Sequence, residues 1–211
     1  MSDLFSGAGK STTAQLFAKE HGHVYYEADC FMNLLNPYIS LDVPEPSLAQ
    51  MDQKCITGYS RETLITIFQG MDEFPKLMEC KPYDVELMKT WYSEMAKDIL
   101  KEKNKFGGSW AVAQAVPSRE FRETIRKVLG DQCIFVILNL SEETNAKRLD
   151  GRHADMDEET KKGILTMMQA MYKLYEPAGE DEDNAVDVEI GPEMDKAAVA
   201  KAVLEKVSKY L

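Results

Sequence analysis

Basic residues are scarce in this chain relative to acidic ones. Its 211 residues include 25 Lys and Arg against 36 Asp and Glu, which gives a net charge of −11. Nucleic acids and anionic membranes are bound by basic surfaces, so this charge argues against both kinds of partner. No apolar run approaches the roughly 18 residues of a transmembrane helix, and the N-terminus lacks the basic and apolar regions of a signal peptide. We therefore expect a cytoplasmic protein that acts on a small molecule.

Cysteine is sparse as well. The four cysteines (Cys30, Cys55, Cys80 and Cys133) are scattered and form no C-x-x-C pair. This spacing argues against a disulfide framework or a zinc site, and we expect reduced thiols. The length and the hydrophobic fraction of 44% suit a single globular domain over residues 1–211, with an inserted region.

The most informative segment begins at Gly7 and reads Gly-Ala-Gly-Lys-Ser-Thr-Thr, directly before a helix-forming run. It matches the second half of the phosphate-binding pattern G-x-x-x-x-G-K-[ST]. In such a loop, backbone N–H groups and the positive end of the following helix surround phosphate oxygens. The expected nucleotide-binding residues are Gly7, Ala8, Gly9, Lys10, Ser11 and Thr12. Lys10 would reach the β- and γ-phosphates as a catalytic cation, and Ser11 would hold Mg²⁺. The alternative is a glycine turn that only caps a helix.

Leu4 occupies the position that this pattern assigns to its first glycine. Three residues precede Leu4, whereas an ordinary strand has about 5–6 residues. We therefore expect the first, central strand of the sheet to be truncated. This departure leaves open a catalytically impaired nucleotide-binding protein.

Apolar periodicity predicts that strands alternate with helices along the rest of the chain. The expected strands cover residues 24–26, 110–116, 133–140 and 185–190, and the expected helices cover 12–21, 61–69, 84–103, 118–128, a long stretch ending at Tyr175, and 194–210. This alternation is typical of a three-layer α/β fold. Residues 34–60 predict a long loop, and the acidic loop 179–184 predicts solvated surface.

Carboxylates follow the strand after the loop helix, at the edge where open α/β sheets bind ligands. Glu27 and Asp29 alternate with Ala28, so both carboxylates can face one side of an extended backbone. We expect both to contact an acceptor. One would orient or deprotonate its hydroxyl, a role we assign to Asp29, and the other could hold Mg²⁺ through water. An acidic strand end that leads into a solvent-exposed turn is the alternative.

Two pairs of arginines are candidates for anion binding. Arg148 and Arg152 flank a helix break at Gly151, which is typical of a cationic lid over residues 148–160 that closes on nucleotide. Arg148 would then contact the nucleotide and Arg152 would act in catalysis. Arg119 and Arg122 begin a helix after the 110–116 strand, where they either bind an acidic acceptor or lie on the surface.

The order of these segments resembles the gluconate kinase (gluconokinase) branch of the small P-loop kinases, which is related to shikimate and nucleoside monophosphate kinases. The segments that carry the resemblance are residues 7–14, 26–31, 116–122, 147–153 and 174–182, the last containing the family's Leu-x-Glu-Pro. The resemblance implies a P-loop NTPase fold with a five-stranded parallel sheet, and an ATP- and Mg²⁺-dependent kinase acting on an alcohol group. It also assigns residues 34–105 to an acceptor-binding region and leaves a homodimer open.

Two departures from the family concern the acceptor. Met32-Asn33 stands where the family has histidine-proline, and its Asp-x-Asp-Arg-x-Pro-Trp segment is not recognisable between Pro44 and Arg61. Kinase chemistry is therefore more strongly indicated than gluconate as the acceptor. A nucleoside monophosphate kinase is the alternative enzyme.

Overall fold

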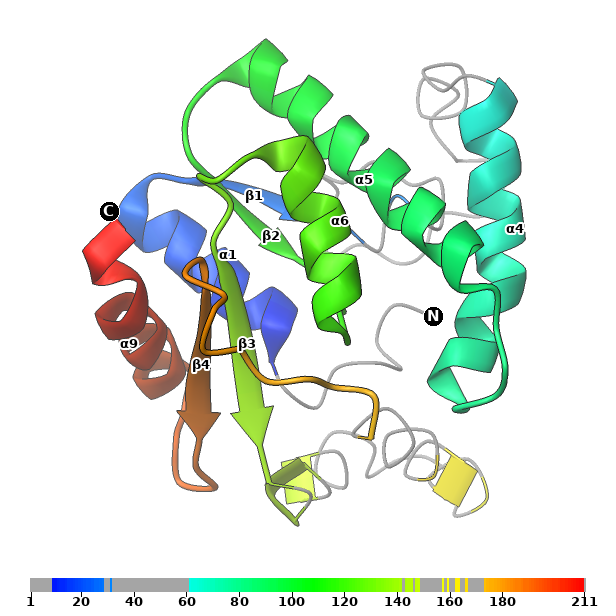
Figure 1. The fold of residues 1–211 in the computed structure, drawn as a ribbon. Helices are drawn as coiled ribbons and strands as arrows, with labels where there is room; N and C mark the ends of the chain where they lie inside the picture. Colours follow the sequence, from blue (N-terminus) through cyan, green and yellow to red (C-terminus); the bar gives the residue numbers. More distant parts are fainter. Residues whose placement is uncertain are drawn as a thin grey trace.

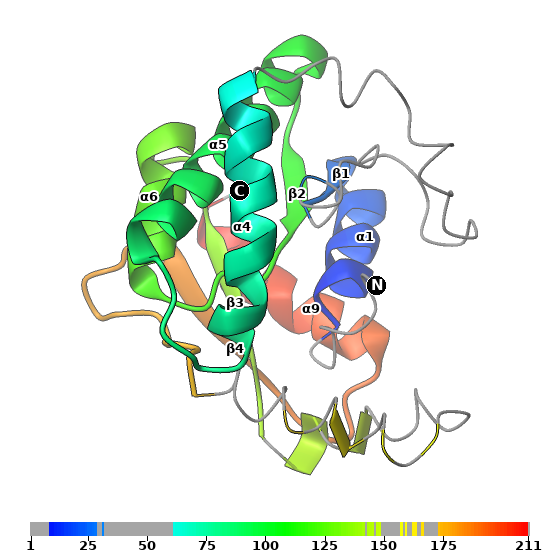
Figure 2. The ribbon, with the colours of Figure 1, turned by 90° about the vertical axis from the view of Figure 1, so that its right-hand side faces the viewer.

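Strands and helices alternate along the chain in a computed structural model that describes residues 9–28, 31, 61–141, 143–145, 147–148, 157, 159, 162–163, 166 and 173–210. In chain order the elements are α1 (Lys10–His21), β1 (Val24–Glu27), α4 (Arg61–Met78), α5 (Val85–Phe106), β2 (Trp110–Ala113), α6 (Arg119–Leu129), β3 (Phe135–Leu140), β4 (Ala185–Ile190), α9 (Lys196–Val207) and the 3-10 helix η3 (Ser208–Tyr210). The strands lie between α1 and α9 on one side and α4, α5 and α6 on the other (Figures 1 and 2). The predicted α/β class, with helices on both sides of parallel strands, is therefore confirmed. None of the described helices is long and apolar enough to cross a bilayer.

The strands form two parallel pairs. β1 pairs with β2, with Val24 opposite Trp110, and β3 pairs with β4, with Phe135 opposite Ala185. Within the described residues, β2 and β3 each pair with one strand, and they are not hydrogen-bonded to each other. The predicted first strand falls on residues 1–8, outside the described residues, so the five-stranded sheet stays a prediction.

Two apolar cores hold the layers together. The larger one joins β1 to α4, α5 and α6, and its buried members include Tyr26, Ile67, Trp91, Tyr92 and Phe121. The smaller one packs β4 against α9 through Val186, Val188, Val199 and Val203. Alternate residues of β4 face α9, as the two-residue period of a strand requires. The two cores fix the strands and the starts of the helices that follow them.

The helix predicted over residues 61–69 is longer than expected, because α4 continues to Met78 with Pro75 inside it. Proline removes one backbone donor from a helix and usually ends it. Here the turn around it buries Phe74 and Leu77, which are 8% and 1% exposed. The apolar burial of these side chains offsets the lost hydrogen bond.

Two other predicted bounds were wrong. β2 ends at Ala113 rather than at residue 116, because the Tyr92 hydroxyl of α5 donates to the Ala115 carbonyl at 2.8 Å and takes the place of a neighbouring strand.

The helix predicted to end at Tyr175 has already ended before that residue, since Lys173 and Leu174 form a turn. The Glu176 N–H donates instead to the carbonyl oxygen of Pro117, in the loop before α6, at 2.8 Å.

Gly70 allows α4 to approach α5 closely, and we expect its replacement by alanine to destabilise the protein. A Cβ at this position would lie 2.3 Å from Trp91 Cδ1, and Trp91 is 0% exposed. Relieving such an overlap in a packed core costs about 1–3 kcal/mol of unfolding free energy. Chemical denaturation of Gly70→Ala measures this loss. Gly163→Ala is the control, because Gly163 is also helical and an added Cβ there meets nothing within 4 Å. Equal stability of the two variants would contradict the expected clash.

Candidate functional site

The first turn of α1 has the features of an anion-binding helix start. Gly9, its N-cap, has φ 79° and ψ 22°, a left-handed conformation that favours glycine, and its carbonyl accepts from the Thr13 N–H at 2.9 Å. Gly9 has no side chain that could cap the helix, and the first turn of α1 contains no acidic residue. The N–H groups and the positive dipole at such a helix start favour binding of a phosphate.

Glu27, at the carboxyl end of β1, is a buried carboxylate. It is 2% exposed, and its Oε2 accepts a hydrogen bond of 2.5 Å from the hydroxyl of Tyr25. Burial, together with this hydrogen bond, raises the pKa of Tyr25 well above its ordinary range. Because β1 packs against α1, the Glu27 carboxylate lies on the strand next to the helix that carries the predicted metal-binding serine.

The starts of two helices and the ends of the strands lie towards one side of the molecule. In Figure 1 the arrowheads of β3 and β4 and the first turns of α1 and α6 all lie in the lower half. Parallel strands bring their carboxyl ends to a single edge, which is where ligands bind in open α/β sheets. The first turns of α1 and α6 therefore lie towards the side of the molecule to which β3 and β4 point.

Arg148 lies at the beginning of the predicted lid and contacts the segment that follows β4. Its Nη2 donates to the carbonyl oxygen of Met194 at 2.8 Å. This hydrogen bond joins the end of the β3 region to the loop after β4. The predicted contact between Arg148 and nucleotide stays a prediction.

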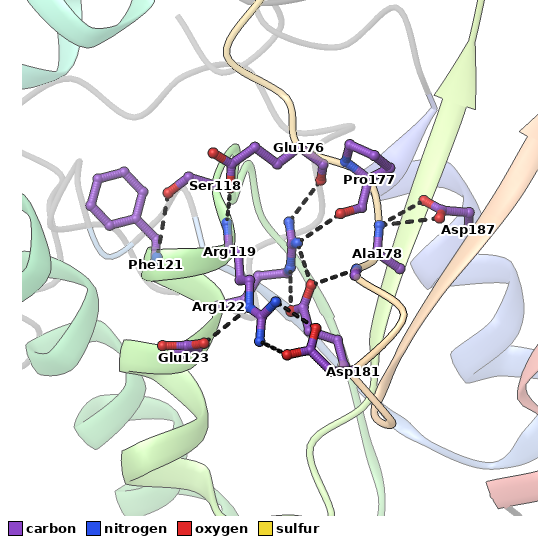
Figure 3. A network of polar contacts seen from close by, with 12 residues as sticks. Ser118, Arg119, Phe121, Arg122, Glu123, Glu176, Pro177, Ala178, Asp181 and Asp187 are labelled. Carbon is purple, nitrogen blue, oxygen red and sulfur yellow. Dashed lines mark hydrogen bonds and ion pairs between the residues drawn. The ribbon is translucent and has the colours of Figure 1, made fainter.

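Arg122 is committed to a buried network at the start of α6 (Figure 3). It is 1% exposed, and its Nε and Nη2 donate to the two carboxylate oxygens of Glu182 at 3.0 and 2.7 Å. Nη1 and Nη2 also donate to the carbonyl oxygens of Glu176 and Pro177 at 2.9 and 3.1 Å. A guanidinium has five N–H groups, so these four bonds leave little of it for a ligand. The contact of Arg122 with an acceptor stays a prediction. Its structural role is to hold the segment 176–182 against α6 through these hydrogen bonds.

Arg119, one turn earlier, also connects α6 to the segment 176–182, through contacts that are more exposed to solvent. Its guanidinium forms two hydrogen bonds with Asp181 at 2.6 and 2.8 Å and one with Glu123 at 3.0 Å. Its backbone N–H donates to Glu176 Oε2 at 2.7 Å, which adds a second acceptor at the start of α6 beside the N-cap Ser118. The side chain of Arg119 is 37% exposed, so it can still face a ligand at this edge.

The acidic loop 179–184 does not consist only of solvated surface, contrary to the prediction. Glu182 is 5% exposed, because the buried Arg122 guanidinium neutralises it. Hydrogen bonding by Arg122 holds the pKa of Glu182 below its ordinary value. The loop therefore anchors the Leu-x-Glu-Pro segment to α6.

Several predicted site residues lie outside the described residues: Gly7, Ala8, Asp29 and Arg152, together with most of residues 148–160 and all of 34–60. Their assigned roles stay predictions. Sequence reasoning missed Tyr25, whose position in a β-rich segment marks it as core. It also missed Glu176 and Glu182, although the Leu-x-Glu-Pro segment was a signal for the first.

The fold matches those of known kinases. A sugar kinase from Janibacter sp. HTCC2649 superposes with a TM-score of 0.59 at 17% identity, over 97% of this chain and 90% of that one. A gluconokinase from Sinorhizobium meliloti 1021 superposes with a TM-score of 0.60 at 16% identity, over 97% of this chain and 88% of that one. No protein-family model matches the chain, and no curated protein matches it by sequence. The chain thus has the fold of these kinases over almost its whole length, as the resemblance in sequence led us to expect.

Proposed function

We propose that this protein is an ATP- and Mg²⁺-dependent phosphotransferase that transfers the γ-phosphate to a hydroxyl group of a small polar acceptor, with gluconate as the first candidate. The observation that carries the proposal is the start of α1, where the left-handed Gly9 leads into Lys10 and Ser11, while β1, which packs against α1, ends in the buried carboxylate of Glu27. Phosphoryl transfer requires mainly this: a cradle for phosphate, a cation and a nearby carboxylate.

The residues fit a magnesium ion by the chemistry of their oxygen atoms. The Ser11 hydroxyl and the Glu27 carboxylate are hard oxygen donors, and no lysine or arginine of the described residues forms an ion pair with Glu27. Across the described chain no cluster of three or more His, Cys, Asp or Glu side chains exists. Mg²⁺ does not require one, since it is usually held by one or two protein oxygens together with phosphates and water. When bound, it neutralises charge on the phosphate oxygens.

We assign each of the other site residues a separate role in binding or catalysis. Lys10 and the N–H groups of residues 7–12 hold the phosphates, and Arg148 with Arg152 covers the nucleotide from the lid. Asp29 takes the proton of the acceptor hydroxyl, with Glu27 beside it. Arg119 supplies positive charge for an acidic acceptor, and Arg122 supports the turn from which Arg119 projects through its bonds to Glu182.

The experiment is a coupled assay of ADP release with gluconate, other sugar acids, shikimate and nucleoside monophosphates, alongside calorimetric titration of ATP. Turnover with a sugar acid and not with a nucleoside monophosphate supports the proposal. Turnover with a nucleoside monophosphate would reassign the acceptor. ATP binding without turnover on any of these acceptors would contradict the proposal and favour a nucleotide-binding protein.

A further inference from the structure

Two arginines of α6 are paired with two neighbouring carboxylates of the loop 179–184, but the two pairs differ in exposure (Figure 3). The side chains of Arg122 and Glu182 are 1% and 3% exposed, whereas those of Arg119 and Asp181 are 37% and 73% exposed. The buried pair holds the loop against the helix. The exposed pair adds little to this, because ions that water can reach contribute little net free energy to a fold.

Asp181 binds Arg119 in the way that a free carboxylate ligand would. Its Oδ1 and Oδ2 accept from Nη1 and Nη2 of Arg119 at 2.6 and 2.8 Å, which is the bidentate contact that a guanidinium makes with a planar carboxylate. Gly179 allows the loop to lie close to this contact, since a Cβ there would be 3.0 Å from both Arg119 Nη1 and Asp181 Oδ1. The terminal edge of the Arg119 guanidinium is therefore occupied by a carboxylate of the chain itself.

The loop does not depend on Asp181 for its position. Glu182 holds it through Arg122, and also accepts from the Gly179 N–H and donates its own N–H to the Gly179 carbonyl, each at 2.9 Å. Asp181 therefore needs only a rotation of its side chain to leave Arg119. Because that side chain is largely exposed, water can replace the arginine as its partner.

An anionic ligand cannot simply be added to this site. Four carboxylates accept hydrogen bonds from the two arginine side chains or from the first N–H group of α6, and these belong to Glu123, Glu176, Asp181 and Glu182. With two guanidinium groups against four carboxylates, the side chains at the start of α6 are already more negative than positive. A further carboxylate is repelled unless one of the four leaves, and Asp181 is the one that occupies both terminal nitrogens of Arg119.

The start of α6 lies towards the side of the molecule to which β3 and β4 point (Figure 1). We propose that Asp181 is a specificity-determining residue, which occupies the place that the acceptor's own carboxylate takes on Arg119. The inference rests on the proposed function in taking the start of α6 as part of the acceptor site. An acceptor with a terminal carboxylate replaces both hydrogen bonds of Asp181, whereas a neutral polyol has no charge with which to displace it. Asp181 thus competes with every acceptor that uses Arg119 and favours carboxylates over their neutral analogues.

The test is calorimetric titration of gluconate into the full chain saturated with a non-hydrolysable ATP analogue and Mg²⁺, repeated with other sugar acids and shikimate. Asp181→Asn removes the internal competitor and should tighten gluconate binding about fivefold, the upper range for an exposed ion pair. Glucitol, the same carbon chain with a hydroxymethyl group in place of the carboxylate, should bind no more tightly to this variant than to the parent.

Two further variants separate competition from a general change in charge. Glu180→Gln removes the same charge from the preceding, exposed residue, which takes part in none of the ion pairs between described residues, so gluconate affinity should stay near the parent's. Arg119→Gln should weaken gluconate binding at least about tenfold. Adding Asp181→Asn to it should recover nothing, because no guanidinium is left to release.

The outcomes separate this inference from the proposed catalysis. Unchanged or weaker gluconate binding by Asp181→Asn overturns the inference even if the parent releases ADP with gluconate, and so does equal tightening by Glu180→Gln. If neither the parent nor Asp181→Asn binds gluconate, another sugar acid or shikimate, the inference is overturned as well. Tighter binding by Asp181→Asn without ADP release leaves the inference supported and removes only the proposed phosphoryl transfer.

Discussion

Lys10→Ala is expected to abolish phosphoryl transfer while leaving the fold intact. Lys10 is the first residue of α1, directly after the left-handed Gly9, where its ammonium group can reach the β- and γ-phosphates. Charge on the transferred phosphoryl group is stabilised mainly by such fixed cations. The loss of one preorganised group of this kind typically lowers the rate at least about a hundredfold.

The stability of this variant should be nearly unchanged, because alanine is the best helix former and Lys10 belongs to no apolar core. Turnover and thermal melting are measured on the same preparation. Lys19→Ala is the matched control, since it removes the same charge from an exposed position near the end of α1. A Lys10→Ala enzyme that retains turnover close to the parent's would remove the phosphate-binding assignment of residues 7–12.

Arg122→Met is expected to cause the largest loss of stability of any single charge removal in the network of Figure 3. The ion pair between Arg122 and Glu182 is buried on both sides, with side chains 1% and 3% exposed. Removing one partner leaves the other charge uncompensated, which costs about 3–5 kcal/mol of unfolding free energy. Chemical denaturation of parent and variant measures this cost directly.

Two variants show whether the uncompensated charge is the cause. Arg119→Met removes an arginine one turn away whose partner Asp181 is exposed, and it should lose much less because exposed pairs stay hydrated. Arg122→Met combined with Glu182→Leu removes both buried charges and should recover most of the loss. If the double variant is no more stable than Arg122→Met alone, the loss comes from packing of the arginine stem and the electrostatic explanation is wrong.

The same pair has a defined dependence on pH. The hydrogen bonds from Arg122 hold the pKa of Glu182 below its ordinary value, so its carboxylate binds protons less readily in the folded state than in the unfolded one. This contribution is fully present above the ordinary carboxyl pKa of about 4.3 and is lost as pH falls through the lower folded value. The difference in stability between the parent and Arg122→Met should therefore shrink on acidification below about pH 4.

Local signals account for the parts of the fold that the sequence predicted well. Ser118 was expected to begin a helix, and its hydroxyl accepts from the Phe121 N–H at 3.4 Å at the start of α6. The apolar run before residue 141 was expected to be a buried strand, and β3 covers most of it. In both cases the deciding interactions involve residues close in sequence, so the pattern contained them.

The errors arose where distant residues decide. β2 ends early because a tyrosine of α5 takes the Ala115 carbonyl. Arg122 is buried because Glu182, sixty positions later, folds back onto α6. A charged residue in the first turn of a helix usually faces solvent, and no local pattern marks the exception.

The pairing of β1 with β2 has a consequence for how the molecule forms. Val24 is opposite Trp110, and α4 and α5 lie between these strands in the chain. The strand that carries Tyr25 and Glu27 therefore has no partner on this edge until both helices have been synthesised and have folded back. Long-range parallel pairing is slow, because a large loop must close before any contact offsets its entropy. Lengthening the predicted loop over residues 34–60 should then delay assembly of the phosphate site while changing equilibrium stability only slightly, since closure entropy grows with the logarithm of loop length.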